Sequence, residues 1–379
     1  MNKKEQHSEQ SQQKPVRFLM VGGFLGAGKT TTIGKLAAHY VAQGKNVALV
    51  TNDQAYNLVD TETLRAQGFQ VGEVPGACFC CKFDDLLSTV DSLSEDAVPD
   101  LIIAEPVGSC TDLVATVIEP MKALFGDRFE TGPLVVLLKP SHGKKILSGG
   151  ERRGFSPKAE YIFLKQLEEA DSIAINKVDR MNEDAREELL RLAKEKFPEK
   201  EVFLMSAREG FGFDDLVAAT EAEPIARSGM MEMDYKVYAE GEAELGWLNC
   251  QVLAEAEDAE SKFSLDEVVL AFVKNIGSQL AAGGAEVAHL KVLGQTLENS
   301  SIANMVSSDG EAELSLASEI NTAKAELLVN ARVATAPEKL AEIVNAVAAE
   351  LQSAMPIAFS IGEMQSFRPG KPEPTHRVT

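Results

Sequence analysis

Short apolar runs alternate with amphipathic stretches over residues 16–222 of this 379-residue chain. Six runs carry the pattern: VRFLMV from residue 16, NVALVT from 46, DLIIAEP from 100, PLVVLLK from 133, DSIAINK from 171 and EVFLMS from 201. Apolar strands separated by amphipathic helices are typical of a parallel sheet covered on both faces. The pattern predicts an α/β domain with a mostly parallel, doubly wound sheet, whose ligands bind at the carboxyl ends of the strands.

The alternation is interrupted at residues 223–233, which we interpret as a linker to a smaller C-terminal α+β domain over residues 234–355. This domain is expected to contain strands at 248–254, 288–293, 302–306, 314–317 and 327–333 and helices at 264–280 and 337–353. Ser264 precedes Glu267 by three residues, the spacing of a capping box. Residues 1–15 are expected to be a disordered tail and residues 356–379 an extended tail.

Residues 139–156, KPSHGKKILSGGERRGFS, are basic, rich in glycine and without periodicity. We predict a mobile surface loop here. A solvated insertion is the favoured interpretation, and contact with phosphates, a partner or RNA is the alternative.

The charge balance restricts the partners of the chain. It carries 58 acidic and 37 basic residues, a net charge of −21, so free nucleic acid would be repelled. No apolar run approaches the roughly 18–20 residues of a membrane span, and the N-terminus lacks the apolar core of a signal peptide. We therefore expect a cytoplasmic protein that binds neither membrane nor nucleic acid. Five cysteines in such a chain favour metal or redox chemistry where they cluster.

Residues 23–30, GFLGAGKT, lie between the first apolar run and a predicted helix, and form a phosphate-binding loop. The glycines let backbone N–H groups face the phosphates, Lys29 reaches the β- and γ-phosphates, and the Thr30 hydroxyl holds Mg²⁺. The motif therefore predicts a P-loop NTPase. The predicted phosphate-binding residues are Gly23, Gly26, Ala27, Gly28, Lys29, Thr30 and Thr31.

The tetrapeptide NKVD after the fifth run favours guanine over adenine. The Asp179 carboxylate can accept hydrogen bonds from guanine N1–H and the exocyclic amine, a pair that adenine does not offer, and an unmatched buried polar group costs roughly 1–3 kcal/mol. Asn176 and Lys177 belong to the same base-binding loop. One strand later, Ser206 and Ala207 are expected to supply a backbone N–H for guanine O6. GTP and GDP are thus the predicted ligands, with ATP as the alternative.

Two further segments are expected to respond to the phosphates. Glu105 and Gly108 follow the buried run LIIAE, where a carboxylate can orient Mg²⁺ or water and the glycine N–H can meet the γ-phosphate. Asp53, after the second run, is the other predicted Mg²⁺ ligand, and Asp91 and Asp112 stay open as alternatives. Lys29, Asp53 and Glu105 are the predicted catalytic groups, and no catalytic base is identified.

Three thiols, Cys78, Cys80 and Cys81, lie within four positions before a helix predicted at residues 83–93. Neighbouring thiolates repel one another unless a cation lies between them, and Zn²⁺ is the usual cytosolic occupant, with Cu(I) also suited. Three ligands leave one tetrahedral position open, which suits metal transfer. Cys110 is a possible fourth ligand or a small buried apolar side chain, and Cys250 is predicted to be a core residue. Inert buried thiols and a redox role are the alternatives for the cluster.

Taken together, the phosphate loop, cysteine cluster, Glu105 segment and NKVD, in this order, resemble the CobW-like metallochaperone GTPases, relatives of the urease and hydrogenase maturation GTPases. The segments GFLGAGKTT and ACFCC followed by Asp85 and Leu86 are similar to signatures of that family. The resemblance implies a GTPase that acts through nucleotide-dependent homodimerisation or partner docking. It also implies a divalent metal, Zn²⁺ or Co²⁺, held between the P-loop side and the switches.

The chain departs from the family pattern in several places. Ala77 stands where the family has glycine, Asp53 replaces a glutamate after the second strand, and Lys139 stands where an aspartate is expected. There is no histidine-rich segment among the five histidines of the sequence, which argues against metal storage.

Two functions are consistent with this sequence. The first is a GTP-hydrolysing metal chaperone that delivers Zn²⁺ or Co²⁺ to a client metalloenzyme or corrinoid protein. The second is a regulatory GTPase that reactivates a partner enzyme and holds only structural metal. The C-terminal domain lies outside the resemblance and is expected to select the client.

Overall fold

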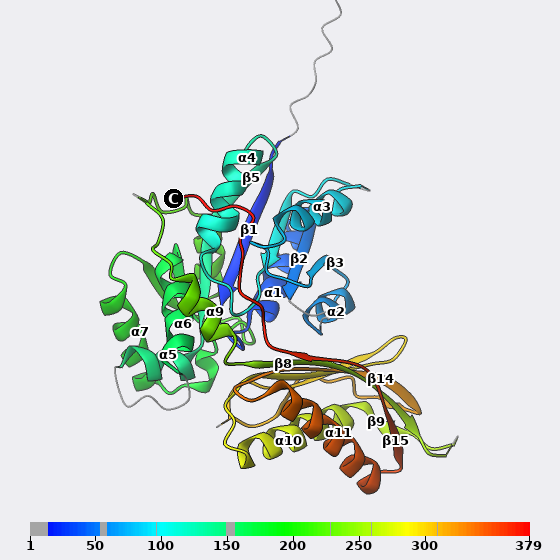
Figure 1. The fold of residues 1–379 in the computed structure, drawn as a ribbon. Helices are drawn as coiled ribbons and strands as arrows, with labels where there is room; N and C mark the ends of the chain where they lie inside the picture. The colour runs from blue at the N-terminus through cyan, green and yellow to red at the C-terminus, as the bar shows by residue number, and fades with distance from the viewer. Residues whose placement is uncertain are drawn as a thin grey trace, which may run out of the picture.

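The structure is a computed structural model that describes residues 14–53, 59–95, 97–148, 156–227, 229–258, 260–308 and 310–379, and it contains two large sheets (Figure 1). Most of the tail predicted at residues 1–15 and residues 149–155 of the predicted loop lie outside this description.

The first sheet is parallel at every pairing, as expected for a doubly wound P-loop fold. Its strands, in order across the sheet, are β3 (Gln70–Pro75), β2 (Val47–Asp53), β4 (Leu101–Glu105), β1 (Val16–Gly23), β5 (Phe129–Leu138), β6 (Ser172–Ile175) and β7 (Glu201–Leu204). The surrounding helices are α1 (Lys29–Ala42), α2 (Val59–Ala66), α3 (Phe83–Leu93), η1 (Val114–Ile118), α4 (Glu119–Phe125), α5 (Pro140–Leu147), α6 (Pro157–Glu169), η2 (Val178–Arg180), α7 (Glu183–Lys196) and α8 (Phe213–Glu221).

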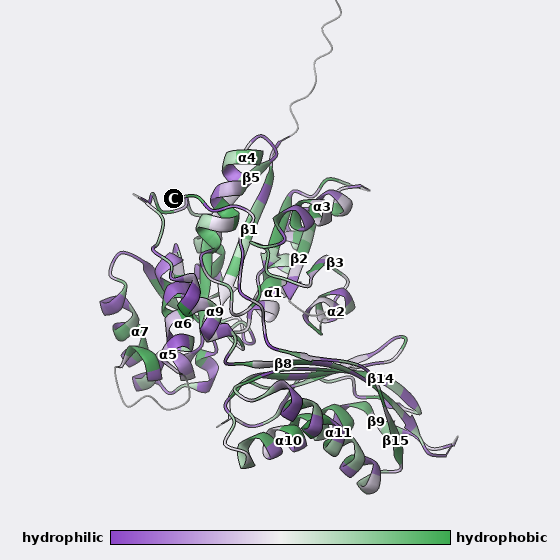
Figure 2. Cartoon of the chain, in the orientation of Figure 1, coloured by the Kyte–Doolittle hydropathy of each residue, from purple (hydrophilic) through white to green (hydrophobic). Residues whose placement is uncertain are grey.

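Helices bury both faces of this sheet. Successive side chains of a strand point to opposite faces, so Phe18 and Met20 of β1 join a core that includes residues of α3 and α6. Leu19 and Val21 join a second core with residues of α1 and α8. Figure 2 shows the apolar colour along β1, whereas much of α7 at the surface is hydrophilic. This two-sided burial explains why the strands are apolar throughout.

The second sheet is antiparallel at every pairing. Its strands, in order, are β12 (Glu313–Leu316), β11 (Ser300–Met305), β10 (Val287–Gln295), β14 (Lys324–Val333), β8 (Gly246–Ala256) and β15 (Ile357–Phe367), and β9 (Phe263–Ser264) pairs with β13 (Asn321–Thr322). Helices α10 (Leu265–Ala282) and α11 (Pro337–Ala354) cover one face, and the first domain lies against the other (Figure 1). Ser264 caps α10, because its Oγ accepts a hydrogen bond from the Glu267 N–H at 3.2 Å.

Three sequence expectations need correction. Residues 357–367 are not a tail but the edge strand β15, so the second domain continues beyond residue 355. The second domain was predicted to begin at residue 234, but helix α9 (Tyr235–Glu242) packs against α6 of the first domain. There Lys158 forms an ion pair with Glu240 at 2.8 Å. Part of the segment predicted as a loop forms helix α5, which begins at a proline, a residue suited to the first helical turn.

After β15 the chain returns along the first domain, where its last residues end (red in Figure 1). The Thr375 N–H donates to the Cys80 carbonyl at 2.8 Å, and the Val378 N–H donates to the Ala115 carbonyl at 2.9 Å. This terminal segment, residues 373–378, therefore lies over the cysteine cluster.

Candidate functional site

A cleft with about 1660 Å³ of empty space lies between the carboxyl ends of the parallel strands and the second sheet. Side chains of β10, β11 and β14 close it opposite the phosphate loop. Among the predicted site residues, those lining the cleft are Gly26, Gly28, Lys29, Thr30, Thr31, Asp53, Glu105, Gly108, Asn176, Lys177, Asp179 and Ala207. The structure thus brings the separate motifs of the sequence together in one place.

The phosphate loop has the backbone geometry that its glycines allow. Gly23 and Gly28 have φ angles of +136° and +98°, a region that other residues rarely adopt. A Cβ atom on Gly28 would lie 2.5 Å from Asn176 Nδ2, and one on Gly23 would lie 2.7 Å from the Leu137 carbonyl oxygen. The Lys29 ammonium donates to the Gly23 carbonyl at 3.1 Å, so it folds back over the loop.

The base-binding loop is tied to the phosphate loop through Asn176. Its Nδ2 donates to the Ala27 carbonyl at 2.8 Å, and its Oδ1 accepts from the N–H groups of Lys177 at 2.8 Å and Ala207 at 2.9 Å. Lys177 has a φ of +65°, and burial lowers its pKa to about 8. Asn176 therefore fixes three loops relative to one another.

The expected contacts to guanine are partly engaged within the protein. Asp179 Oδ1 accepts from the Ser206 hydroxyl at 2.6 Å, so one oxygen of the carboxylate is already engaged. The Ser206 N–H donates to the Phe211 carbonyl at 2.8 Å, and the Ala207 N–H donates to Asn176. A guanine O6 would have to share one of these N–H groups, so the O6 contact stays a prediction.

Thr30, Asp60 and Glu105 form a cluster of oxygen donors at the phosphate end. The Thr30 hydroxyl lies 2.8 Å from Asp60 Oδ1 and 3.1 Å from Glu105 Oε1, and the Lys29 ammonium lies 4.0 Å from Glu105 Oε1. Glu105 Oε2 is buried without a hydrogen-bond partner among the described residues. Burial, followed by the neighbouring Asp60, raises the pKa of Glu105 to about 8. A hard cation such as Mg²⁺ fits this donor set, because it would satisfy the unpartnered carboxylate oxygen.

Asp53 lies in the cleft but is held by the second domain. Arg332 Nη2 donates to both of its carboxylate oxygens, at 2.9 and 2.8 Å. Arg332 itself is 1% exposed. Asp60, on the helix after β2, is thus the aspartate bonded to Thr30, and the Mg²⁺ role of Asp53 stays a prediction.

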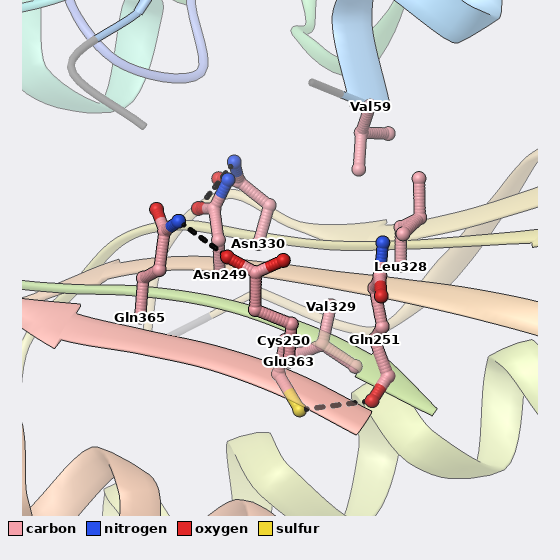
Figure 3. A pocket seen from close by; sticks show the side chains of 9 residues that line it. All are labelled: Val59, Asn249, Cys250, Gln251, Leu328, Val329, Asn330, Glu363 and Gln365. Atoms are coloured by element: carbon pink, nitrogen blue, oxygen red, sulfur yellow. Dashed lines mark hydrogen bonds between the residues drawn. The ribbon is translucent and has the colours of Figure 1, made fainter. Parts of the chain in front are cut away.

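A smaller depression of about 290 Å³ lies on the same sheet, next to Val59 of α2 (Figure 3). Its polar side chains bind one another: Asn330 Nδ2 donates to Asn249 Oδ1 at 3.0 Å, and Gln365 Nε2 donates to Glu363 Oε1 at 2.8 Å. We assign no chemistry to this depression. The sheet face towards the first domain carries these polar side chains beside a buried apolar cluster of Val59, Leu293, Ile302 and Leu328.

The loop at residues 106–112 extends from the phosphate site to the cysteines. A Cβ atom on Gly108 would lie 2.7 Å from the Leu25 side chain of the phosphate loop, so the two loops are in close contact. Buried Gln166 of α6 donates to the carbonyls of Gly108 at 3.0 Å and Cys110 at 2.8 Å. Asp112, at the far end, is 1% exposed and pairs with Arg377 at 2.7 Å.

Four thiols gather where this loop meets the segment before α3. Cys78, Cys80 and Cys110 are buried and Cys81 is partly exposed. The sulfurs of Cys80 and Cys81 lie 3.7 Å apart, and the Cys110 thiol is in hydrogen-bond contact with that of Cys78. Hydrogen bonds with Cys78 and Cys81 raise the pKa of Cys80, whereas the hydrogen bond from Cys80 lowers the pKa of Cys81. Cys81 is thus more ready to ionise than Cys80 or Cys110, whose pKa values are raised.

The cysteine cluster fits a thiophilic metal in part. Bonds of about 2.3 Å to a tetrahedral zinc place two sulfurs about 3.8 Å apart, which the Cys80–Cys81 pair nearly meets. Over the described ranges of the chain, however, no three or more His, Cys, Asp or Glu side chains are arranged to hold a metal ion. The Glu373 N–H meanwhile donates to Cys81 Sγ at 3.2 Å. Metal binding by these cysteines stays a prediction and requires rearrangement of the side chains.

Comparison with known families decides the relationship of the first domain. The family described as CobW/HypB/UreG, nucleotide-binding domain, matches residues 17–204. The chain contains a CobW/HypB/UreG nucleotide-binding domain. This match covers the phosphate loop, the cysteine cluster and NKVD, and it confirms the resemblance inferred from these motifs.

Two zinc chaperones and a solved structure are similar to the chain over different lengths. The zinc chaperone YeiR of Escherichia coli (strain K12) is 30% identical over 182 residues, which are 46% of this chain and 50% of that protein. The zinc chaperone CobW of Sinorhizobium sp is 36% identical over 97 residues, 24% of this chain and 27% of that protein. The chain thus spans half or less of the length of these two zinc chaperones. A Zn(II)-bound YjiA GTPase structure from E. coli has 14% identity and a TM-score of 0.37, covering 88% of this chain and 99% of that one.

Sequence reasoning on the CobW/HypB/UreG domain missed the groups that face it from the second domain. His289 and Lys291 on β10 and Arg332 on β14 all line the cleft. Polar residues at alternate positions of apolar strands, as in VAHLKVL and LLVNARV, were the available signal. Asp60 was missed because it lies in a helix rather than at a strand end.

No helix within the described residues has the length and apolar character needed to span a membrane.

Proposed function

We propose that this chain is a GTP-hydrolysing metal chaperone, which delivers Zn²⁺ or Co²⁺ to a client metalloenzyme or corrinoid protein. The observation that carries the proposal is the loop at residues 106–112, which contacts the phosphate loop at Gly108 and the cysteine cluster at Cys110. A change at the γ-phosphate would move this loop and with it a thiol. The similarity to the zinc chaperones YeiR and CobW supports the same class of function.

The proposed ligands follow from the cleft. Lys29 and the phosphate loop would bind the GTP phosphates, and Asn176, Lys177 and Asp179 would hold the guanine. Thr30, Asp60 and Glu105, with Asp53 as the sequence-based alternative, would hold Mg²⁺, which neutralises phosphate charge when bound. The Glu105 carboxyl must lose its proton to serve as a ligand, and the positive charge of Lys29 favours that loss.

The cargo metal would be bound by Cys78, Cys80 and Cys81, with Cys110 near enough to take part after rearrangement. Thiolates rather than thiols bind Zn²⁺, so loading releases protons. Docking to a client or to a second copy of the chain is the proposed step that completes transfer.

Equilibrium dialysis tests this function. The chain is dialysed against Zn²⁺ or Co²⁺ without nucleotide, with GDP and with a non-hydrolysable GTP analogue. We expect about one metal per chain, with an affinity that differs at least tenfold between the two nucleotide states. The Cys78→Ser/Cys80→Ser/Cys81→Ser variant should lose the metal, whereas the matched control Cys250→Ser, in the other domain, should keep it.

Two results would contradict the proposal in different ways. Equal metal stoichiometry in the triple variant and the wild type would exclude the cysteine cluster as the site. Tight metal that no nucleotide mobilises would instead support a regulatory GTPase with structural metal.

A further inference from the structure

The strands of the second sheet present polar side chains to the nucleotide cleft at alternate positions. His289 and Lys291 of β10 line the cleft, whereas Leu290 and Val292 between and beside them are buried in the core under α10 and α11. This alternation matches the strand period of two. The polar residues are therefore positioned towards the phosphate loop by the pleat of the sheet, not by a flexible loop.

Lys291 reaches the phosphate end of the cleft. Its ammonium lies 2.5 Å from Asp60 Oδ1, the same oxygen that accepts the Thr30 hydroxyl at 2.8 Å. The Lys291 side chain is 12% exposed, so its charge is shielded from most of the solvent. Its positive charge acts on Glu105 as well, because it opposes the rise in the pKa of that carboxyl.

Four of the other cations that line the cleft are committed elsewhere. Arg332 holds Asp53, Arg180 and Arg208 pair with Glu313, and Lys177 belongs to the base-binding loop. The partner of Lys291, in contrast, is the Asp60 carboxylate, which also accepts the hydroxyl of Thr30 in the phosphate loop. A cation bound at Thr30 and Asp60 would take this carboxylate, and an incoming phosphate would then be the available counter-charge for Lys291.

We propose that Lys291 is a catalytic residue of GTP hydrolysis, supplied by the second domain, that stabilises the charge developing on the transferring γ-phosphoryl group. The proposal rests on the proposed GTPase function and assigns the second domain a part in it. An arginine finger does this work in other GTPases, and a lysine offers the same charge as a compact point donor.

The hydrolytic step itself needs no proton from Lys291. The water oxygen forms a bond to the γ-phosphorus while the bond from that phosphorus to the β–γ bridging oxygen breaks. GDP leaves with the electron pair, and the protons of water pass to the released phosphate and the solvent. Lys291 stays protonated throughout and contributes only its charge and hydrogen bonds.

Steady-state kinetics of Lys291→Met and Lys291→Arg test the proposal, together with the affinity for a non-hydrolysable GTP analogue. We expect kcat of Lys291→Met to fall by about 10²–10³-fold, as when one transition-state donor is removed, with less than a fivefold change in analogue affinity. Lys291→Arg should recover part of kcat. The control is Lys324→Met on β14, whose ammonium is exposed and pairs with Glu255, and which should match the wild type. Unchanged thermal unfolding midpoints would show that the variants are folded.

The outcomes separate the two claims. If the wild type hydrolyses GTP and Lys291→Met is equally fast, the role of Lys291 is wrong and the GTPase function stands. If Lys291→Met raises KM and leaves kcat unchanged, Lys291 stabilises bound GTP and the transition state equally and is not catalytic. A wild type that hydrolyses no GTP overturns the proposed function and the role of Lys291 with it.

Discussion

Gly28 is the residue at which the phosphate loop and the base-binding loop meet. It has a left-handed backbone, and a Cβ atom there would lie 2.5 Å from Asn176 Nδ2. Gly44, at the end of α1, also has a positive φ of +82°, but a Cβ atom there meets nothing within 4 Å. Alanine variants at these two glycines therefore separate the effect of backbone strain, which both share, from the effect of a steric clash with Asn176, which only Gly28→Ala has.

We expect Gly28→Ala to lower the affinity for guanine nucleotides at least tenfold, because Asn176 must move and release Ala27 and Ala207. Gly44→Ala should cost only about 1 kcal/mol of unfolding free energy from backbone strain and leave nucleotide affinity unchanged. Fluorescent GTP-analogue titration and urea unfolding measure the two quantities. Equal loss of affinity in both variants would show that strain, not contact with Asn176, controls the site.

Single residues of the site were predictable where a motif fixes them. The spacing of GFLGAGKT and NKVD assigned Lys29, Thr30 and Asn176 to one site, and all three line the cleft. Their tasks in phosphate and base binding stay predictions. Asp60 and Lys291 were not predictable in this way. Their roles depend on the second sheet lying over the cleft, a long-range arrangement that no local spacing encodes.

At the scale of elements, the segment at residues 373–378 crosses the cysteine cluster. Glu373 and Thr375 bind Cys81 Sγ and the Cys80 carbonyl through their N–H groups. Arg377 fastens the segment by donating to Asp112 at 2.7 Å and to the Met231 carbonyl at 2.9 Å. The same aspartate accepts the Tyr235 hydroxyl at 2.7 Å, so the fastening point joins the loop at residues 106–112 to α9.

Loss of this fastening should expose the thiols. We expect Arg377→Ala to increase the rate of Cys81 alkylation severalfold, since the hydrogen bond to Cys81 Sγ would no longer be held in place. Arg368→Ala, which removes a contact to the Ala243 carbonyl before the segment begins, is the control and should react like the wild type. Labelling followed by peptide mass analysis gives the rate at each cysteine. Unchanged reactivity of Cys81 in Arg377→Ala would mean that the segment does not shield the thiol.

The elements of the chain were predictable to different degrees for a physical reason. The parallel strands are recognisable as continuous apolar runs because both faces of their sheet are buried. Helix α10 is recognisable from the capping residue Ser264 at its start. Strand β15 pairs with β8 along one edge only and keeps polar residues such as Glu363 and Gln365, so its sequence lacks a strong strand pattern. Helix α5 was missed because a proline and a glycine, read as loop signals, stand inside an eight-residue helix.

At the scale of the whole molecule, polar and ionic contacts join the two domains across the cleft. Besides the pairs of Arg332 with Asp53 and Lys291 with Asp60, the Lys139 ammonium donates to the Val306 carbonyl after β11. Lys139 is buried, and burial lowers its pKa. Apart from its position at a strand end, nothing in the sequence identified it as an interdomain contact. Charged contacts of this kind are suited to an interface that changes with the charge of a bound nucleotide.

The Arg332–Asp53 pair is the most buried of these links and offers a direct measure of domain coupling. Arg332 also lies 4.1 Å from the ring centroid of Trp247, the single tryptophan of the chain. Trp247 packs in a core cluster formed mainly by the first domain, so its fluorescence reports unfolding of the region where the two domains meet. In a double-mutant cycle of Arg332→Met and Asp53→Asn, urea unfolding without nucleotide should give a coupling free energy of about 1–3 kcal/mol, because a charge-assisted pair that involves a buried arginine is broken. Additive effects, within about 0.5 kcal/mol, would mean that the pair does not hold the domains together. If Asp53 instead ligates Mg²⁺, the coupling should disappear when Mg²⁺ and a non-hydrolysable GTP analogue are present, whereas it should persist if Asp60 is the ligand.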